Sequence, residues 1–512
     1  MKEMKEMEIP NRNSSEQDEL LRGTLGDTEN ITNESGKEEP KKVNSFTTIL
    51  SIWNSMIGSN TVVLHNNVYN AGIIPAIFLS IIYGLICFYT CKIYVDFGMN
   101  EPDFSITIQK YLNKMFGPKI AKIGKNIQII FNTLITLGGV LIYFLIMSQN
   151  LYPIVCLILE KIGVEVNPDT TPEFGRFSLI YLSIALCFAL FPFTIKKDIG
   201  FLVKLSSYGI YFISILIIFQ IYVGISSLIN TDFYFAYKKN KTDSNKRYLL
   251  LFGENPAIMA GAISLGYFCH TTILPTLKSN KNQKNNISDL FIAYVCVCFT
   301  FAFVGIMGYI GFSGKNFDAE FQQNWFYFFD YDDYYILFFR LLSVFQLMTV
   351  FPILVYVVRF HFFNFIYGNE YPSKKHTIIY GICVLILCLF IVYFFHKYLA
   401  NLLGIIGATT SLILIYSFPP FIKMISYFLK LRGDDIYGKT KDNLANKSIQ
   451  IDTDAEETEE THGKSENNDK KVKFGYKDIL YFVAQSSLLL IGIATVIFQY
   501  VPINFFNIKL ED

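Results

Sequence analysis

The chain has 512 residues, of which 52% are hydrophobic and only 17% are charged, and its mean hydropathy is +0.34. A soluble multidomain enzyme would need far more charged surface, so this class is excluded. The 44 basic and 43 acidic residues give a formal charge of +1, which provides no field for binding nucleic acid. We therefore expect an integral membrane protein whose apolar side chains face the lipid bilayer.

Two polar segments frame the apolar part of the chain. Residues 1–43 hold eleven acidic and seven basic residues and almost no aromatic side chain, so they predict a disordered cytoplasmic tail. No basic region with a short apolar core follows Met1, so we expect no cleaved signal peptide. Residues 431–474 predict a disordered acidic cytoplasmic loop. A transport core would then occupy 44–430, and a last helix with a short C-terminus would occupy 475–512.

Eleven apolar runs are each close to the 20 or so residues that a helix needs to cross a bilayer. Their approximate bounds are 46–69, 73–97, 120–151, 177–195, 202–229, 256–277, 288–312, 333–366, 377–397, 402–430 and 476–501. The expected fold is therefore an all-α polytopic membrane protein with eleven transmembrane helices.

The positions of Lys and Arg place the N-terminus in the cytoplasm, because basic residues gather at alternate ends of the expected spans. The loop 230–255 departs from this pattern, since it carries five basic residues on the expected outer side. The same loop contains Asn240-Lys-Thr, which would be a glycosylation acceptor on the outer or luminal face.

The first span contains a polar, glycine-containing stretch, Asn54-Ser-Met-Ile-Gly-Ser-Asn-Thr. Backbone groups that are left unpaired inside a membrane cost several kcal/mol, so this stretch needs an explanation. One explanation is a broken helix whose N–H groups bind a substrate carboxylate and whose oxygens hold a cation. The other is a face of small residues that packs against a neighbouring helix.

The sixth span repeats this anomaly. Glycines, a proline and a serine lead into Tyr267-Phe-Cys-His-Thr-Thr at a similar depth. Two interrupted helices five spans apart are typical of transporters in which spans 1–5 and 6–10 form an inverted repeat, with the ligand at the two breaks. The pair of anomalies favours the broken-helix explanation for both spans.

Two ionisable side chains are candidates for a gate or a proton-sensitive group. Arg340, in the eighth span, would be costly in lipid and is expected either to face the protein interior or to extend to an interface. His270 lies beside the second expected break, whereas isolated histidines elsewhere are more often satisfied or interfacial side chains. No P-loop, metal-ligand spacing, nucleophile elbow or carboxylate pair predicts catalysis, so we expect no enzyme and no organic cofactor.

At these residues the chain resembles the amino acid/auxin permease superfamily, and within it the sodium-coupled neutral amino acid transporter family. The similarity is carried by Phe46-Thr-Thr-Ile-Leu-Ser-Ile-Trp-Asn-Ser-Met-Ile-Gly-Ser, by Phe268-Cys-His-Thr-Thr-Ile-Leu, by Asn285-Asn-Ile-Ser-Asp-Leu-Phe-Ile-Ala-Tyr and by Phe345-Gln-Leu-Met-Thr-Val-Phe-Pro. These motifs occur in the family's order, and the similarity extends over roughly 45–430 and the final helix.

The resemblance implies the LeuT-like five-plus-five inverted repeat with broken helices 1 and 6. It also implies that Asn54 and Thr349 form a Na⁺ site, for which side-chain amide and hydroxyl oxygens are suitable hard ligands. The amino acid substrate would be held around the two breaks. The residues expected there are Met56, Ile57, Gly58, Ser59, Asn60, Thr61, Ser264, Leu265, Gly266, Tyr267 and Phe268.

The chain departs from the family pattern after Gly58, where relatives often continue Gly-Ser-Gly or Gly-Thr-Ser and this chain has Ser59-Asn60. Side-chain preference is therefore left open. Loop 230–255 lacks the paired cysteines of plasma-membrane relatives, which favours a lysosomal, vacuolar or endosomal membrane over the plasma membrane. Glu16-Gln-Asp-Glu-Leu-Leu fits an acidic dileucine signal, which would bring a cytoplasmic sorting partner to the tail.

The sequence thus predicts a secondary active transporter of α-amino acids that works by alternating access. Coupling to Na⁺ is favoured over coupling to H⁺. The alternative is an amino-acid sensor with little net flux, in which ligand binding changes how the N-terminal tail meets a signalling partner. Gradient-driven uptake would separate the two.

Overall fold

A computed structural model describes residues 44–58, 60–101, 103–167, 176–196, 205, 208–237, 247–313, 324–330, 333–368, 372–432 and 475–500. All of these residues belong to one unit, Asn44–Asp512. The predicted tail 1–43, the glycosylation candidate Asn240 and nearly all of the predicted loop 431–474 lie outside the described residues.

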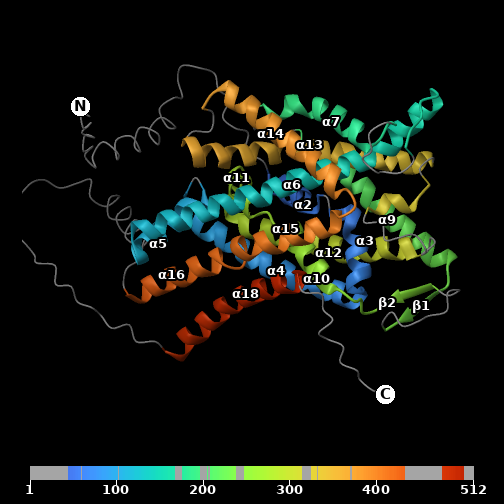
Figure 1. Ribbon diagram of the computed structural model, residues 1–512. Coiled ribbons are helices and arrows are strands. Elements are labelled where there is room, and N and C mark those ends of the chain that lie inside the picture. The colour runs from blue at the N-terminus through green and yellow to red at the C-terminus, as the bar shows by residue number, and fades with distance from the viewer. Residues whose placement is uncertain are drawn as a thin grey trace, which may run out of the picture. The chain divides into compact units, whose positions relative to one another are not determined.

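Helices make up almost all of this unit (Figure 1). In chain order the α-helices are α2 (Ser45–Ile57), α3 (Asn60–Ala71), α4 (Ile73–Gly98), α5 (Phe104–Phe116), α6 (Pro118–Lys161), α7 (Leu179–Thr194), α9 (Gly209–Asn230), α10 (Pro256–Gly266), α11 (His270–Lys278), α12 (Asn286–Ser313), α13 (Tyr334–Tyr367), α14 (Lys374–Phe395), α15 (Leu399–Leu414), α16 (Phe418–Arg432) and α18 (Tyr476–Tyr500). Two short 3₁₀ helices are η1 (Gln283–Asn285) and η2 (Trp325–Phe328).

Within the described residues, nine helical segments are long and apolar enough to cross a membrane. Each overlaps one of the eleven expected spans. The expected span 46–69 is formed by two helices, α2 and α3, of 13 and 12 residues. The expected span 177–195 is α7, whose 16 residues are also short for a crossing. A mostly helical polytopic membrane protein is therefore established, and the count of eleven spans stays a prediction.

A pair of short parallel strands departs from the all-α expectation. Strand β1 (Phe233–Ala236) pairs with β2 (Arg247–Leu250), and Phe233 lies opposite Arg247 in the register. The backbone that follows β2 is bound to the turn between α3 and α4, since the N–H of Gly253 donates to the carbonyl oxygen of Ala71 at 2.9 Å. The described part 247–255 thus runs from β2 past the end of α3 into α10.

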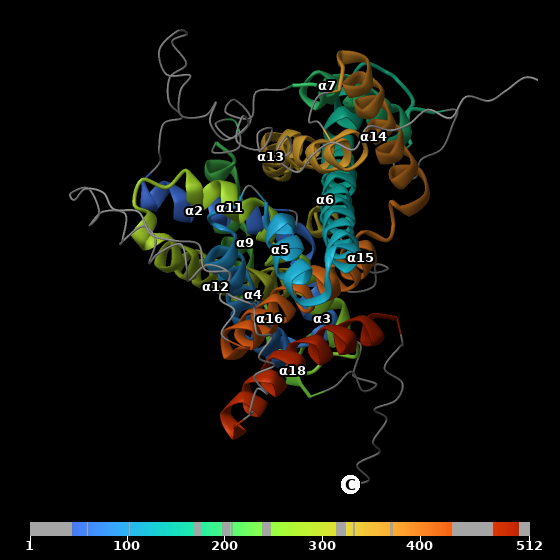
Figure 2. The same ribbon diagram turned by 90° about the vertical axis from the view of Figure 1, so that its left-hand side faces the viewer.

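The helices of the expected first and sixth spans pack against each other. Helix α3 contacts α10, and α2 contacts α11. Helix α12 lies along both α2 and α3, while α6 and α13 form another extensive helix pair. Figure 2 shows α6 and α13 beside each other, with α7 and α14 next to them.

Many polar side chains are buried between the helices, and apolar side chains cover the outer surface of the helix bundle. Buried polar residues include Asn54, Asn60 and Thr349, which are at most 7% exposed. Phe188 on α7 and Leu490 on α18 are instead 77% and 66% exposed. This distribution is expected of helices in a bilayer, where apolar side chains face the lipid and polar groups find partners in the protein interior.

Helix α18 is attached to the other helices partly through one hydroxyl group. The hydroxyl of Tyr89 on α4 accepts hydrogen bonds from Lys423 Nζ at 3.0 Å and from Gln485 Nε2 at 2.6 Å. Lys423 also lies over the Tyr89 ring, 4.5 Å from its centroid. Because Lys423 is on α16 and Gln485 is on α18, this hydroxyl joins three helices.

We expect Tyr89→Phe to lower the melting temperature of the purified protein by several degrees. The ring and its contact with Lys423 are retained, but the shared acceptor is lost, and a buried donor without its partner costs about 1–3 kcal/mol. Tyr211→Phe is the matched control, because Tyr211 on α9 is 69% exposed. Equal melting temperatures for the two variants would show that the Tyr89 hydroxyl does not hold α18.

Candidate functional site

The first interruption lies between α2 and α3. Helix α2 ends at Ile57, Gly58 has φ 36° and ψ −130°, and α3 begins at Asn60. A positive φ of this kind is strained for residues other than glycine. A Cβ atom on Gly58 would also overlap the hydroxyl of Tyr143 on α6. The backbone turn and the close approach of Tyr143 both require glycine here.

The second interruption lies between α10 and α11. Helix α10 ends at Gly266 and α11 begins at His270. Between them, the carbonyl oxygen of Tyr267 accepts a hydrogen bond from the hydroxyl of Tyr294 on α12 at 3.0 Å. The hydroxyl of Tyr267 donates to the carbonyl oxygen of Ser80 on α4 at 3.0 Å. A side chain of α12 and a backbone carbonyl group of α4 therefore hold the segment that joins α10 to α11.

The two interruptions lie next to each other. Asn60, the first residue of α3, donates from Nδ2 to the carbonyl oxygen of Ala262 on α10 at 3.5 Å. A Cβ atom on Gly266 would overlap Asn60 Nδ2, so the end of α10 fits directly against the start of α3. The backbone N–H groups at the start of α3 and the carbonyl groups at the end of α10 are thereby brought to one place.

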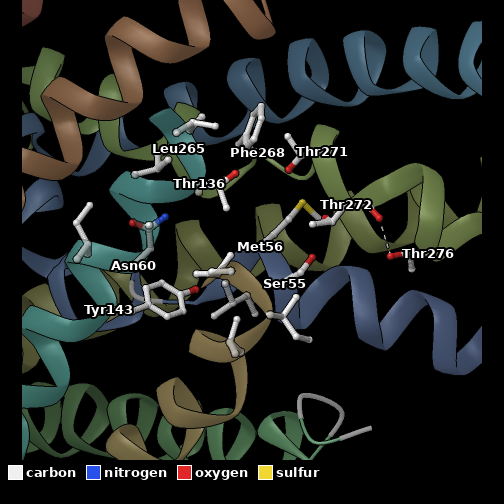
Figure 3. A pocket seen from close by; sticks show the side chains of 18 of the residues that line it. Ser55, Met56, Asn60, Thr136, Tyr143, Leu265, Phe268, Thr271, Thr272 and Thr276 are labelled. Carbon is white, nitrogen blue, oxygen red and sulfur yellow. Dashed lines mark hydrogen bonds between the residues drawn. The ribbon is translucent and has the colours of Figure 1, made fainter. Parts of the chain in front are cut away.

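A cavity of about 180 Å³ opens beside this junction (Figure 3). Cavities of about 150 Å³ in protein cores hold ligands the size of benzene, so the volume suits a small organic molecule. Helices α2, α3, α6, α10, α11 and α13 supply its walls. The lining residues are Ser51, Ser55, Met56, Ile57, Asn60, Ile135, Thr136, Gly139, Ile142, Tyr143, Leu265, Gly266, Phe268, Thr271, Thr272, Thr276, Val350, Ile353 and Leu354.

The lining is uncharged and combines apolar side chains with hydroxyl groups. None of the described residues that line the cavity is Asp, Glu, Lys, Arg or His. Several hydroxyl groups in the wall donate to carbonyl oxygens of their own helices and so present lone pairs to an occupant. These are Ser55 to Ile52 at 2.8 Å, Thr136 to Asn132 at 2.8 Å, Thr272 to Cys269 at 3.2 Å and Thr276 to Thr272 at 2.8 Å.

The structure places some of the predicted substrate residues in the cavity wall and others away from it. Six of them line the cavity: Met56, Ile57, Asn60, Leu265, Gly266 and Phe268. Gly58 forms the turn beside it, and Ser59 lies outside the described residues. The others make contacts within the protein and are absent from the described lining: Thr61, Ser264 and Tyr267.

Thr61 and Ser264 are bound to neighbouring parts of the chain, α9 and the turn between α15 and α16. The carbonyl oxygen of Thr61 accepts a hydrogen bond from Gln220 Nε2 on α9 at 2.8 Å. The hydroxyl of Ser264 lies 2.9 Å from the carbonyl oxygen of Ala260 and 3.1 Å from the hydroxyl of Tyr416. Both residues therefore support the backbone near the two interruptions.

Sequence reasoning missed the contribution of α6. Thr136, Gly139 and Tyr143 lie three and four residues apart and so share one face of this helix. They line the cavity, and Tyr143 does so next to Gly58. This spacing of small and polar residues within an apolar run was visible in the sequence. It did not by itself show which helix the face meets, and the same holds for Thr272 and Thr276 on α11.

Asn54 and Thr349 meet at a second place. An added Cβ on Gly209, the first residue of α9, would lie 2.6 Å from Thr349 Oγ1, 3.4 Å from Asn54 Nδ2 and 3.8 Å from Asn54 Oδ1, the atom that could bind a cation. Asn54 is 3% exposed and Thr349 is 7% exposed. Thr349 Oγ1 donates to the carbonyl oxygen of Gln346 at 2.6 Å, which leaves its lone pairs available. An amide and a hydroxyl that converge from α2 and α13 fit a hard cation such as Na⁺.

The two gate candidates lie outside the cavity. His270 is 1% exposed and its Nε2 lies 3.1 Å from Thr90 Oγ1 on α4. Arg340 is also 1% exposed, and its Nη2 donates to the carbonyl oxygen of Phe326 at 2.6 Å. Its guanidinium lies over the Phe326 ring, 5.6 Å from the centroid. Arg340 thus faces the protein interior, where it holds η2.

The segment around η2 is wedged between other helices. Trp325 is 1% exposed, and its Nε1 donates to the carbonyl oxygen of Gly308 on α12 at 3.3 Å. Asn324 donates from Nδ2 to Asn150 Oδ1 on α6 at 2.7 Å, and Asn150 donates in turn to Ser343 Oγ on α13 at 3.0 Å. Because η2 also contacts α3, this segment packs against α3, α6, α12 and α13.

Comparison with known proteins finds a family model and relatives that are named amino acid transporters. Residues 41–434 match the family model described as transmembrane amino acid transporter protein. The sodium-coupled neutral amino acid transporter 9 homolog of Caenorhabditis elegans is 23% identical over 439 residues, which cover 75% of this chain and 69% of the relative. The neutral amino acid transporter 9 of Xenopus laevis is 25% identical over 442 residues, covering 76% of each chain.

Among solved structures, a nucleobase-cation-symport-1 family transporter in a closed conformation with bromovinylhydantoin bound aligns with 92% of this chain and 95% of its own. The TM-score is 0.49 and the sequence identity is 10%.

Proposed function

The chain belongs to the transmembrane amino acid transporter protein family, and from this membership we propose that it is a secondary active transporter that moves neutral α-amino acids by alternating access with Na⁺ coupling. The observation that carries the proposal is the uncharged cavity beside the junction of α2–α3 with α10–α11. A substrate that binds there would contact both interrupted helices at once.

The main-chain groups at this junction are suited to the two charged ends of an α-amino acid. The N–H groups at the start of α3 have no partner within their own helix and carry the positive end of its dipole, so they attract a carboxylate. Carbonyl groups at the end of α10 carry the negative end of that helix dipole and attract an ammonium group. Asn60 lies between the two helix ends, where it would help to position the substrate.

The cavity wall supports a neutral substrate side chain. A cationic or anionic side chain would enter a site whose described lining offers no opposite charge, and burying an unpaired charge is costly. The relatives in C. elegans and X. laevis are named neutral amino acid transporters, which is consistent with this lining.

Asn54 and Thr349 would hold the coupling Na⁺ at Gly209, with further oxygen ligands from the main chain. When bound, the ion supplies the free energy of its gradient, about 2.3 kcal/mol for one charge moved across 100 mV. Because one ligand is on α2 and the other on α13, an occupied site would join a helix of the interrupted pair to a helix outside it. Substrate binding and ion binding are then coupled through α2.

Alternating access would use the two ends of the interrupted helices. The cavity runs between α2 and α11, where Ser51, Ser55 and Thr276 line it, while η2 with Trp325 closes another side of α3. This arrangement supports a state that opens toward the N-terminal end of α2.

We further propose eleven spans with a five-plus-five inverted repeat, a cytoplasmic N-terminus and an intracellular, lysosomal or endosomal membrane.

Uptake by the purified full-length protein in liposomes tests this function. We expect an inward Na⁺ gradient to drive accumulation of labelled neutral amino acids, with arginine and glutamate at least tenfold poorer substrates. The physical reason is the uncharged lining. The measurement is initial uptake for a panel of amino acids, with Na⁺ replaced by choline in parallel samples.

Two outcomes would contradict the proposal. Uptake that is driven by a pH gradient and does not respond to Na⁺ would show that H⁺ is the coupling ion. Saturable binding without any gradient-driven accumulation would instead match an amino-acid sensor, and deletion of residues 1–43 would then test whether the tail carries the signal. A chemically altered amino acid after incubation, detected by mass spectrometry, would overturn transport altogether.

A further inference from the structure

A third helix interruption lies between α15 and α16, where the sequence predicted the single span 402–430. Helix α15 ends at Leu414 and α16 begins at Phe418. Pro419 and Pro420 follow directly. Proline has no backbone N–H, so two carbonyl groups of the turn between the helices cannot form the usual helical hydrogen bond. Carbonyl groups without a helical partner therefore collect at the end of α15, where the helix dipole is negative.

Side chains from α4 and α6 converge on this end of α15. Tyr94 on α4 donates from its hydroxyl to the carbonyl oxygen of Leu414 at 3.3 Å. The same hydroxyl accepts a hydrogen bond from Gln128 Nε2 on α6 at 2.9 Å. Gln128 Nε2 also lies 3.5 Å from Asn132 Oδ1, one turn further along α6. All four residues are at most 1% exposed, so their polar groups meet in the protein interior.

The amide of Gln128 is satisfied at its nitrogen and not at its oxygen. Its Oε1 is buried and has no hydrogen-bond partner among the described residues. A buried acceptor without a partner is costly, so it points to a ligand at this place. A half-turn of the amide exchanges the positions of Nε2 and Oε1. Oε1 would then lie beside the Tyr94 hydroxyl and Asn132 Oδ1, and all the oxygens could face one ligand.

The chemistry of these oxygens suits a monovalent cation. They belong to a hydroxyl, a main-chain carbonyl and two amides, whereas divalent cations are held mainly by carboxylates. An anion would be repelled by the oxygen lone pairs and by the negative end of the α15 dipole. Asp103 acts electrostatically on the Tyr94 hydroxyl, and its carboxylate favours a cation nearby. In transporters with interrupted membrane helices, half-helix C-terminal ends and unwound carbonyl groups coordinate Na⁺.

We propose that Tyr94, Gln128, Asn132 and the carbonyl oxygen of Leu414 form a second monovalent-cation site, separate from the Na⁺ site proposed at Gly209. Its ligands lie on α4, on α6 and at the end of α15. A bound ion would therefore fasten the third interruption to two other helices.

This second site lies one helical turn from the cavity wall. Thr136 lines the cavity, and its hydroxyl donates to the carbonyl oxygen of Asn132 at 2.8 Å. An ion that holds Asn132 would also hold this turn of α6, and so would fix one wall of the cavity. The inference does not depend on the substrate or on the ion that drives uptake.

Thermal unfolding of the purified full-length protein tests the site, with NaCl, KCl or choline chloride titrated at constant ionic strength. Every sample carries Asn54→Ala and Thr349→Val, so that binding at Gly209 does not contribute. The test variant adds Gln128→Met, which keeps the length of the side chain and removes its polar atoms.

The matched control adds Gln149→Met to the same background. Gln149 also lies on α6 and is 3% exposed, and its Nε2 donates to the carbonyl oxygen of His396 at 2.6 Å. Its Oε1 likewise has no hydrogen-bond partner among the described residues, but the Tyr94 hydroxyl and Leu414 are elsewhere. The control therefore removes an equivalent buried amide outside the proposed site.

In the background protein we expect at least one of NaCl and KCl to raise the melting temperature by several degrees relative to choline chloride, because a ligand that binds only the folded state stabilises it. Gln128→Met should raise the half-saturating salt concentration by roughly tenfold or more, since bonds to a charged partner are strong. Gln149→Met should leave it unchanged. Tyr94→Phe, which keeps the ring and removes one oxygen, should act in the same direction as Gln128→Met and serves if that variant does not fold.

Two results would overturn the second site. One is a melting temperature of the background protein that is equal in the three salts. The other is a cation response that Gln128→Met and Tyr94→Phe leave intact. If Gln128→Met lowered stability equally in every salt, a buried water would complete the hydrogen bonds of Gln128, and the ion would again be excluded. Each of these results leaves the proposed transport function standing, because uptake in liposomes measures that function separately.

Discussion

Replacing Gly58 by alanine is expected to reduce amino acid uptake by at least a hundredfold. The residue has φ 36°, and a Cβ atom there would overlap the hydroxyl of Tyr143. The strain of a non-glycine residue in such a conformation costs about 1–3 kcal/mol, and Tyr143 must move as well. Since Tyr143 lines the cavity, the substitution disturbs both the backbone turn and the site. Initial uptake in liposomes, at matched protein content, measures the effect.

Gly163→Ala separates strain from steric overlap. Gly163 has φ 83°, yet no atom lies within 4 Å of an added Cβ. This control should lose some thermal stability and keep its uptake. In the double variant Gly58→Ala/Tyr143→Phe the hydroxyl is gone, although ring atom Cζ would still lie 3.0 Å from the new Cβ, so partial recovery is expected. Normal uptake by Gly58→Ala alone would show that the turn is not needed for transport.

Thr349→Val and Asn54→Ala are each expected to weaken the Na⁺ dependence of uptake. Valine keeps the shape of threonine but offers no oxygen, and a bond to a charged partner is worth about 1.5–3 kcal/mol. The Na⁺ concentration for half-maximal uptake should therefore rise by at least tenfold. Gly209→Ala should act in the same direction, because its methyl group would lie 2.6 Å from Thr349 Oγ1. Uptake measured over a series of Na⁺ concentrations gives the shift.

Thr133→Val is the matched control for the threonine substitution. Thr133 on α6 also donates to a carbonyl oxygen of its own helix, that of Ile129 at 2.8 Å, but it lines neither the cavity nor the Gly209 contact. It should leave the Na⁺ response unchanged. If Thr349→Val behaved like Thr133→Val, the ion would have to bind elsewhere. The approach of Asn54 and Thr349 to Gly209 would then be a packing contact and not an ion site.

The family resemblance drawn from the motifs is confirmed by the match over residues 41–434. Those motifs were readable because glycine, asparagine and serine inside an apolar run are costly in lipid and so stand out against their surroundings. The span 46–69 is an instance: its length predicted one crossing, and the structure forms it from α2 and α3 with Gly58 between them. A polar segment inside a span was visible, while the way it is divided into helices was not.

Other features could not be inferred from local pattern. Residues 230–255 were expected to be a loop between two spans, yet strands β1 and β2 pair within it. The pairing of Phe233 with Arg247 depends on contacts between separate stretches, which no periodicity reveals. Tyr267 was expected to touch substrate because it lies at the second interruption. Its hydroxyl donates to the carbonyl oxygen of Ser80 on α4, because the direction of a side chain outside a helix depends on what packs around it. Its contact with the substrate stays a prediction.

The sequence by itself determined that this protein lies in a membrane, which stretches form its apolar helices and where two of them carry polar interruptions. Hydropathy and the cost of unpaired backbone groups act locally, so a single chain displays them. Only the tertiary structure decided that Asn60 meets the end of α10, that a face of α6 completes the cavity and that Asn54 and Thr349 converge at Gly209. These contacts join residues that are far apart in the chain, and they depend on how the helices pack together.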